Sequence, residues 1–471
     1  MNFSPNLLFP RVKISPFRRA IIITSAGGIL FALSHCTPLP SAKTKDISKN
    51  LKIPKRYDAS QPSVPEVTSG LLDVFSDSRM RSYVQTALKK NPDLRESAAR
   101  LEEVGFDIRI AKSAGSPSLN INTNASRASN FNFGRQDIFS AVLDTSWEVD
   151  VWGRIRAGVT AATSDRAAAA ADYAAARESI AAQTMQAYFQ LVTTEKLLAL
   201  SGRRLESFEK TLKLVDRRFE AGTGNLGDVN LARTDVENTR AQVSERKDTR
   251  DQAARALAAL MGNYPNAKNR VYSWPVLRRA VPAGIPSDLL LKRPDIDAAY
   301  QRIRAADARV KVAHRELYPR FTLTGSGGQQ SPQLSELANS AFTVWSFAGG
   351  FAGPLLAGGG GRAEFRASNA RAKQALANYQ SIVLNAFREV EDALGSELYL
   401  KRQQTAYQQA LKAARSAELR TQRNYEQGVV EILTLLDTQR RSFDTEESLI
   451  NTQSLRYQNR VSLALALGKG L

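Results

Sequence analysis

The stretch Asn424-Tyr-Glu-Gln-Gly-Val-Val-Glu-Ile-Leu-Thr-Leu-Leu-Asp-Thr-Gln-Arg440 interrupts a long helical pattern at Gly428 and then restarts it. Glycine commonly follows the last turn of a helix because it readily takes up the left-handed conformation. The stretch therefore predicts the tip of a helical hairpin. The segment Arg218-Phe-Glu-Ala-Gly222 has the same order of basic or polar residue, aromatic, Glu and Gly, 206 residues earlier (428 − 222). The chain thus has two matching tips.

Other landmarks recur in the same order along the chain. Pro92 matches Pro294 and Pro117 matches Pro319, both at an offset of 202 residues (294 − 92 and 319 − 117). A shared order with little drift predicts a tandem duplication. We expect a first repeat over 71–262, a linker over 263–286 and a second repeat over 287–471, with hairpin tips at about 220–228 and 426–432.

Strand patterns follow the first helix of each repeat. Leu119 and Ile121 would share one face of a strand, and Asn120 and Asn122 the other. Similar alternation over 139–152, 320–326 and 341–353 predicts two strands per repeat, in β-hairpins at about 117–152 and 319–354. Such strands suit a transmembrane barrel, although a soluble hairpin with one face on a core also alternates. We expect swivels between strands and helices at Pro117, Pro319 and Pro354.

Long helical patterns occupy the second half of each repeat. Residues 154–220 contain no proline, and Leu191, Leu198, Leu205, Leu212 and Phe219 recur every seven residues. After the tips, the register continues through Val229, Val236, Val243 and Leu257, broken by Arg250, and through Leu436, Phe443, Ile450 and Tyr457. This spacing predicts antiparallel coiled coils. The helix over about 362–427 is more polar, which fits either a water-lined interior or a solvated outer face.

The composition argues against several classes of function. The formal charge is +19, but the basic residues are interspersed with acids, which indicates a solvated surface rather than a nucleic-acid interface. One cysteine and two histidines leave no His/Cys metal cluster and no Ser-His or Cys-His nucleophile system. The Gly-x-Gly-x-x-Gly pattern over 222–227 resembles a dinucleotide-binding motif, but that motif must follow a strand. Here the pattern follows a helix, so it predicts a turn and not a nucleotide site. We expect no cofactor, no metal, no catalytic residue and no enzyme activity.

The N-terminus has the pattern of an export signal. Basic residues precede an apolar run over 20–33, which is too short for a membrane-spanning helix. Leu33-Ser34-His35-Cys36 resembles a lipobox, although a small residue is usual where His35 stands. We expect a signal peptide over 1–35, lipid attachment at Cys36 and a tether over 36–70; an ordinary signal peptide with an incidental cysteine is the alternative.

Together, the lipobox-like signal and the duplicated Pro-Asp helix, hairpin and aromatic-x-x-Gly tip resemble the TolC-type outer-membrane efflux proteins, in particular the lipoprotein branch that includes OprM and NodT. The resemblance implies a mainly α fold with a transmembrane β part. Long coiled-coil hairpins would form a periplasmic tunnel, and three chains would share one 12-stranded outer-membrane barrel. Four strands per chain cannot close a barrel alone, and counting strands also allows a dimer with eight. Three-fold symmetry therefore comes from the family.

The resemblance also implies a gate at the periplasmic end. Matched to the family's motif, Leu433 would form an apolar constriction, Asp437 an acidic ring and Arg440 a partner in the ion pairs that keep it shut, while Thr434 stands where some relatives have a second Asp. Their spacing places them on one helix face. A surface ion pair between Asp437 and Arg440, worth about 0 to 1 kcal/mol, is the simpler alternative. The expected adaptor-docking tips contain Gly222, Gly224, Gly428 and Val429.

The leading hypothesis is a passive exit duct in the outer membrane. It would receive drugs, toxic small molecules or metal ions from an inner-membrane pump of the resistance-nodulation-division type through a periplasmic adaptor. The expected partners are two further copies of the chain, the adaptor, the pump and outer-membrane lipid, but no nucleic acid. One alternative is the exit duct of a type I protein secretion system. Another is a non-conducting periplasmic coiled-coil scaffold, which would be water-soluble.

Overall fold

A computed structural model describes residues 57–58, 70–130, 134–277, 290, 292–354 and 358–470. The predicted signal peptide, Cys36 and most of the predicted tether lie outside the described residues. Lipid attachment therefore stays a prediction, and the fold concerns the two repeats.

Three pairs of helices repeat along the chain with equal lengths of 22, 67 and 35 residues. The predicted continuous helix over 154–220 is confirmed. None of the helices among the described residues is both long and apolar enough to cross a membrane. The first-repeat helices are α4 (Pro92–Ser113), α5 (Arg154–Glu220) and α6 (Leu226–Leu260), and the second-repeat helices are α8 (Pro294–Arg315), α9 (Gly360–Glu426) and α10 (Ile432–Ala466).

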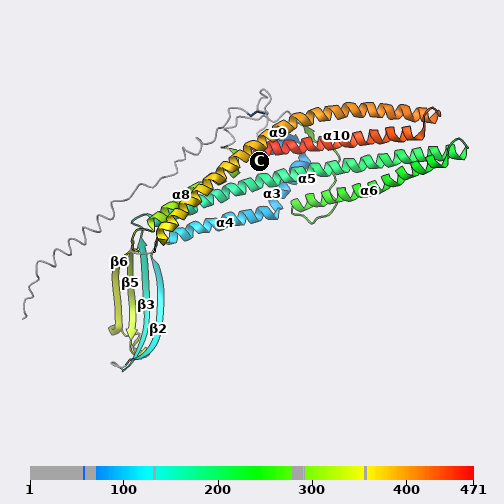
Figure 1. Ribbon diagram of the computed structural model, residues 1–471. Coiled ribbons are helices and arrows are strands. Elements are labelled where there is room, and N and C mark those ends of the chain that lie inside the picture. Colours follow the sequence, from blue (N-terminus) through cyan, green and yellow to red (C-terminus); the bar gives the residue numbers. More distant parts are fainter. Residues whose placement is uncertain are drawn as a thin grey trace, which may run out of the picture. The chain divides into compact units, whose positions relative to one another are not determined.

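The two long hairpins pack through their returning and outgoing helices. Contacts join α9 to α10, α10 to α5, and α5 to α6, and Figure 1 shows these helices side by side in that order. Burying the heptad side chains of both hairpins removes apolar surface from water, which is the main term that holds such helices together. One cluster near the tips contains Phe208, Val215, Val229, Ala232, Val236, Tyr425, Ile432, Leu435 and Leu436.

Arg250 interrupts the heptad of α6, yet its side chain is buried. Its Nη1 lies 3.1 Å from Asp251 Oδ1, so a neighbouring carboxylate offsets part of the cost of burying the charge. Burial raises the pKa of nearby Glu195, and the charges of Arg250 and Arg270 oppose that rise.

Three distant segments meet near the middle of the long helices. The strand β1 (Phe75–Ser76), which precedes α3 (Ser78–Lys90), pairs antiparallel with β4 (Val276–Leu277) in the linker. The Tyr457 hydroxyl donates to the Pro275 carbonyl at 2.7 Å, and its ring stacks on Trp274 with centroids 4.6 Å apart. Leu71 N–H donates to the Gly470 carbonyl at 2.9 Å. These bonds fix both repeats to each other.

The larger sheet has four antiparallel strands in the order β2-β3-β5-β6 (Figure 1). Their ends differ from those that the alternation alone predicted. The strands are β2 (Ser118–Asn130), β3 (Gly134–Val149), β5 (Arg320–Ser331) and β6 (Thr343–Ala352). The pairing of β3 with β5 joins the hairpins of the two repeats into one sheet.

The prediction that the second strand reaches Trp152 is wrong, because β3 ends at Val149. The Asp150 carboxylate accepts from the backbone N–H groups of Ile155 at 3.0 Å and Arg156 at 2.9 Å. These N–H groups lie in the first turn of α5, which has no intrahelical partners for them. Capping thus ends the strand, even though the alternating pattern continues through Val151.

The register gives the sheet two chemically different faces. Leu119 pairs with Thr145, Ile121 with Leu143, and Gly325 with Phe347, so their side chains share a face. That face also carries Phe139, Ala141, Trp147, Phe321, Leu323, Trp345 and Phe351. The opposite face carries Asn120, Asn122, Asn124, Ser140, Asp144, Ser146, Thr324, Ser326 and Ser346. The predicted period-two pattern is therefore confirmed for β2, β3 and β5, although Val142 of β3 lies on the polar face. On β6 the same face carries Val344 and Ala348 beside Ser346.

Candidate functional site

Both hairpin tips use the same helix-ending motif. Gly222 has φ 74° and Gly428 has φ 75°, so both take up the left-handed conformation that glycine favours. Thr223 N–H donates to the Arg218 carbonyl at 2.9 Å, and Val429 N–H donates to the Asn424 carbonyl at 2.8 Å. These bonds satisfy carbonyls that the helix ends would leave free. The matching geometry explains why the two tips share a sequence pattern.

Gly224 lies close to the end of α5. A Cβ at this position would lie 3.0 Å from Phe219 N, which is tighter than most side-chain contacts. The chain must pass close to the end of α5 before α6 begins. Val429 is 68% exposed at the second tip, so its apolar side chain is available at the end of the hairpin.

The two tips are fastened to each other by an arginine and a tyrosine. The Arg218 Nη1 donates to the Tyr425 carbonyl at 3.0 Å, and the guanidinium carbon lies 4.8 Å from the centre of the Tyr425 ring. A cation over an aromatic face contributes about 0.5 to 2 kcal/mol, depending on how well it is desolvated. The tips of the two repeats therefore lie at the same level.

The structure separates the predicted gate residues into two different pairings. Arg440 donates to both oxygens of Asp235 on α6, at 2.7 and 2.6 Å. Asp437 instead lies 2.8 Å from Arg441, four residues later on the same helix. The ion pair between Asp437 and Arg440 that the spacing allowed is not formed. The reason is that Arg440 faces the neighbouring hairpin, where a buried carboxylate needs a partner.

Asp437 and Leu433 lie on the exposed side of α10. Leu433 is 56% exposed, Asp437 is exposed, and Thr434 is also exposed. An exposed leucine beside an exposed carboxylate has no partner to bury it among the described residues. These three side chains are therefore exposed together, whereas the Arg440 side chain reaches across to Asp235 on α6.

Above the tips, carboxylates of α10 bind arginines of the other three long helices. Glu446 binds Arg203 of α5 at 2.6 Å and Arg415 of α9 at 2.8 Å. Asp444 binds Arg204 of α5, and Glu447 binds Arg246 of α6. These charge-assisted bonds lie beside a buried apolar cluster of Leu197, Leu200, Phe443 and Ile450, so both terms hold this part of the bundle together.

This cross-linking predicts a pH dependence centred on Glu446. Burial alone would raise the pKa of Glu446, but Arg203 and Arg415 outweigh it and hold the pKa below its usual value. A depressed folded-state pKa contributes stability above the unfolded pKa, and that stability is lost as the pH falls through the folded one. We expect Glu446→Gln to lower the thermal midpoint measured by circular dichroism at pH 7. The difference from wild type should shrink below about pH 4; a difference independent of pH would contradict this assignment.

The strand-to-helix junctions of the two repeats differ in how they are held. Pro117 and Pro319 directly precede β2 and β5, and Pro354 follows β6 by two residues. The Trp152 Nε1–H donates to the Pro319 carbonyl at 2.8 Å, which ties the first junction to the second repeat. Before α9, a Cβ at Gly358 or Gly359 would meet no atom within 4 Å among the described residues.

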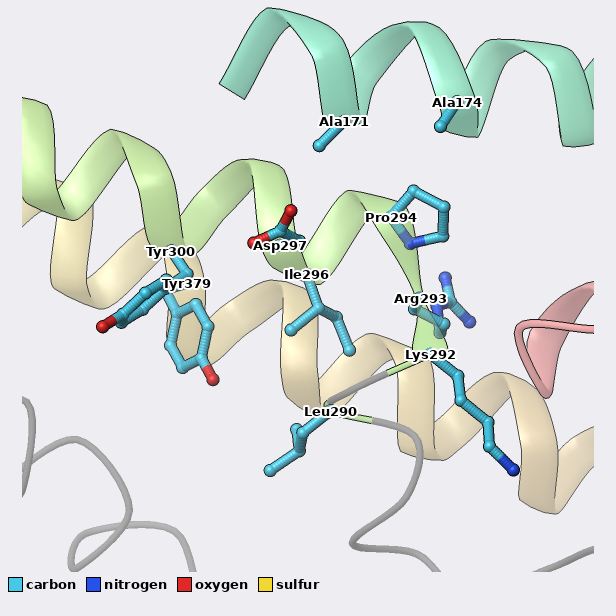
Figure 2. Close-up of a pocket in the computed structure, with 10 residues that line it drawn as sticks. All are labelled: Ala171, Ala174, Leu290, Lys292, Arg293, Pro294, Ile296, Asp297, Tyr300 and Tyr379. Atoms are coloured by element: carbon cyan, nitrogen blue, oxygen red, sulfur yellow. The ribbon is translucent and has the colours of Figure 1, made fainter. Parts of the chain in front are cut away.

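A cavity of about 560 Å³ lies where α8 begins, against α5 and α9 (Figure 2). Figure 2 shows Tyr300 and Tyr379 side by side at one end and Arg293 at the other. Arg293 is fully engaged, because it binds Asp295 and Glu389 at 2.7 Å and donates to the Ala466 carbonyl at 3.2 Å. No group of metal-binding side chains occurs among the described residues. The cavity is a gap between helices, and its arginine is already engaged by two carboxylates.

Two functional contacts were missed by reasoning from the sequence. Local spacing offered Asp437 as the partner of Arg440, whereas the partner in the structure, Asp235, belongs to the first repeat. A signal was present, since Asp235 occupies the buried stripe of α6 next to Val236. The second missed contact joins the two tip motifs: Arg218 of the first tip lies over the ring of Tyr425 in the second and donates to its carbonyl.

Comparisons with known proteins agree with this architecture. The sequence pattern described as "Outer membrane efflux protein" matches residues 83–263 and 285–469, one match for each repeat. "Cation efflux system protein CusC" of Escherichia coli (strain K12) is 27% identical over 452 residues, covering 94% of this chain and 98% of that protein. "Outer membrane protein OprJ" of Pseudomonas aeruginosa is 32% identical over 405 residues, covering 84% and 85%.

A solved structure shares the fold closely. The Campylobacter jejuni CmeC outer membrane channel superposes with a TM-score of 0.84 at 25% identity, covering 90% of this chain and 94% of that one. The family pattern spans both repeats, and the similarity to these relatives runs through hairpins, sheet and tips alike. The chain belongs to the outer membrane efflux protein family.

Proposed function

We propose that this protein is the passive exit duct of a tripartite efflux system in the outer membrane. The two-faced sheet carries this proposal, because an apolar face suits lipid and a polar face of Asn, Ser and Thr suits a water-filled passage. The long hairpins would continue that passage through the periplasm. The relatives include proteins named as components of cation, solvent and toluene efflux systems.

The duct is completed by further copies of the chain. The sheet ends in two edge strands, β2 and β6, that have no partner among the described strands. Exposed edges of long strands are rarely left unpaired in stable proteins. Three copies joined from β6 to β2 would give 12 strands, which is the arrangement that the family resemblance implies. The barrel would cross the outer membrane, and acylation at Cys36 would add a lipid anchor.

The periplasmic end of the duct would be closed by the second-repeat hairpins. Leu433, Thr434 and Asp437 would face the axis from the open side of α10, and the bond between Arg440 and Asp235 would hold α10 against α6. The adaptor would engage the tips around Gly222, Gly224, Gly428 and Val429. The adaptor passes cargo from an inner-membrane pump, so its docking is the event that would free α10.

The described residues include no group of metal-binding side chains that could select a cargo ion in the passage. Met80, Met185 and Met261 are all buried, so these thioethers are not available to bind soft cations. The polar face of the sheet consists mainly of neutral hydrogen-bonding side chains. Selection would therefore rest with the pump, and the duct would serve small molecules or ions without binding them tightly.

Two measurements test this proposal: channel conductance of the purified protein and export of a pump substrate from cells. Purified protein should give discrete conductance steps in planar bilayers, and cells lacking it should accumulate a fluorescent pump substrate until the protein is restored. Extraction from cells by buffer without detergent, with no conductance, would favour the soluble scaffold instead. Loss of polypeptide secretion with unchanged export of small molecules would favour the type I secretion duct.

A further inference from the structure

The outgoing helix α9 carries an exposed cationic face near the tips. Six basic residues between positions 401 and 423 lie within about 140° of one another around a helix of 3.6 residues per turn. All six are exposed, and only Glu426 adds an acid to this sector. Arg415 binds Glu446 on α10, but the other five form no ion pair with the described residues. The face consists of Lys401, Arg402, Lys412, Arg415, Arg420 and Arg423.

The returning helix α6 carries an acidic face that complements it. Glu237, Glu245 and Asp248 lie within about 80° of one another around the helix. All three are exposed, whereas the buried side chains of Val236 and Thr239 lie on the opposite side, toward the other helices. Glu245 forms no ion pair with the described residues, and the partners of the other two lie on α6 itself.

The two faces lie at matching distances from the tips. Glu237 lies 15 residues after Gly222 (237 − 222), and Lys412 lies 16 residues before Gly428 (428 − 412). The two separations differ by one residue. Asp248 and Arg402 are equally far from these two glycines (248 − 222 and 428 − 402). Because each residue of a helix rises about 1.5 Å, the paired positions agree within one turn.

The two glycine turns define a common level. The Arg218 guanidinium lies over the ring of Tyr425, which joins the tips directly. Farther along the hairpins, Asp235 binds Arg440. Asp235 lies 13 residues after Gly222 (235 − 222), and Arg440 lies 12 residues after Gly428 (440 − 428). These separations also differ by one residue. Residues equally far from Gly222 and Gly428 are therefore equally far along the bundle.

Within one chain the two charged faces cannot meet. The helices lie in the order α9, α10, α5, α6, so α9 and α6 are at opposite ends of the row (Figure 1). Closing copies into a ring joins the free end of one row to the free end of the next, which is the head-to-tail contact of a cyclic oligomer. A ring brings α9 of one copy beside α6 of its neighbour.

We propose that the cationic face of α9 binds the acidic face of α6 on a second copy of this chain. Lys412 lies opposite Glu237 of the neighbour, and Arg402 lies opposite Asp248. Surface ion pairs are individually weak, so their main effect is on register, because like charges meet whenever the hairpins slide. The proposal rests on the ring of the proposed function and assigns its helical seam.

Cross-linking tests the seam directly. A chain carrying Arg402→Cys and Asp248→Cys should give covalent dimers and trimers with a short bismaleimide, seen on a denaturing gel. The matched control carries Arg402→Cys with Lys247→Cys, whose exposed side chain is the adjacent one in sequence and about 100° round the helix. The single variant Arg402→Cys measures any cross-linking between the new cysteine and the natural Cys36. We expect at least a several-fold higher trimer yield from the first pair than from either control.

Charge reversal provides a second measurement. Arg402→Glu with Lys412→Glu should reduce the oligomer that survives mild detergent at low salt, and adding Glu237→Lys with Asp248→Lys should restore it. An intact, conducting oligomer without the specific cross-link would overturn the seam but leave the duct standing. Cross-linking of Arg402→Cys to a different protein in cells would also overturn it. A chain that remains monomeric and non-conducting would instead remove the proposed function.

Discussion

Replacing Arg440 with glutamine should raise the single-channel conductance of the purified protein several-fold. Arg440 donates two hydrogen bonds from α10 to the carboxylate of Asp235 on α6. Asp235 is 8% exposed, so little water reaches its carboxylate. A hydrogen bond to a charged group contributes about 1.5 to 3 kcal/mol, reduced here because the Arg440 side chain is partly exposed. Losing it weakens the attachment of α10 to the neighbouring hairpin near the tip, where the channel would close.

The adjacent arginine provides the control for this experiment. Arg441 is exposed and binds Asp437 at 2.8 Å on its own helix, an arrangement worth about 0.3 to 0.5 kcal/mol. Arg441→Gln removes the same charge without breaking the bond to Asp235, so its conductance should rise far less than that of Arg440→Gln. Asp235→Asn should act like Arg440→Gln, and the double variant should add little, because both remove one interaction. Unchanged conductance of Arg440→Gln in an intact oligomer would exclude this bond from the gate.

Periodicity explains why so much of the architecture can be predicted from the sequence. A seven-residue repeat such as Leu191, Leu198 and Leu205 specifies one helix face regardless of what covers it. Duplication doubles the signal, and the equal helix lengths of the two repeats follow from it. Pro92 and Pro294 are the first residues of α4 and α8, and they mark helix starts because their missing amides are not needed there.

The remaining features depend on partners that local spacing does not reveal. Arg440 has one acid nearby on its own helix and another in the first repeat, and the nearer one is not used. The ends of the strands cannot be predicted from local alternation for a similar reason. Arg127 and Asp137 form a bidentate pair beyond the apolar part of β2 and β3, so the alternation predicted from Leu119 to Ala125 stops short of the hydrogen-bonded ladder.

The second large effect is expected from a charge on the apolar face of the sheet. Leu143 lies near the middle of β3, is 48% exposed and shares its face with Ile121. An arginine on the lipid side of a membrane barrel costs about 2 to 4 kcal/mol at the midplane, and a ring contains one from every copy. Leu143→Arg should therefore strongly reduce the folded oligomer in the outer-membrane fraction, measured as the heat-modifiable band on gels.

A polar-face variant of the same strand separates a membrane effect from a folding defect. Ser146 is exposed on the opposite face and pairs with Ser118 and Thr324. Ser146→Arg adds the same side chain to the proposed lumen, where substitutions alter conductance more than stability. It should assemble normally and change the conductance. A water-soluble scaffold predicts the reverse, because an exposed leucine changed to arginine would cost it little. Normal assembly of Leu143→Arg would therefore mean that this face does not contact lipid.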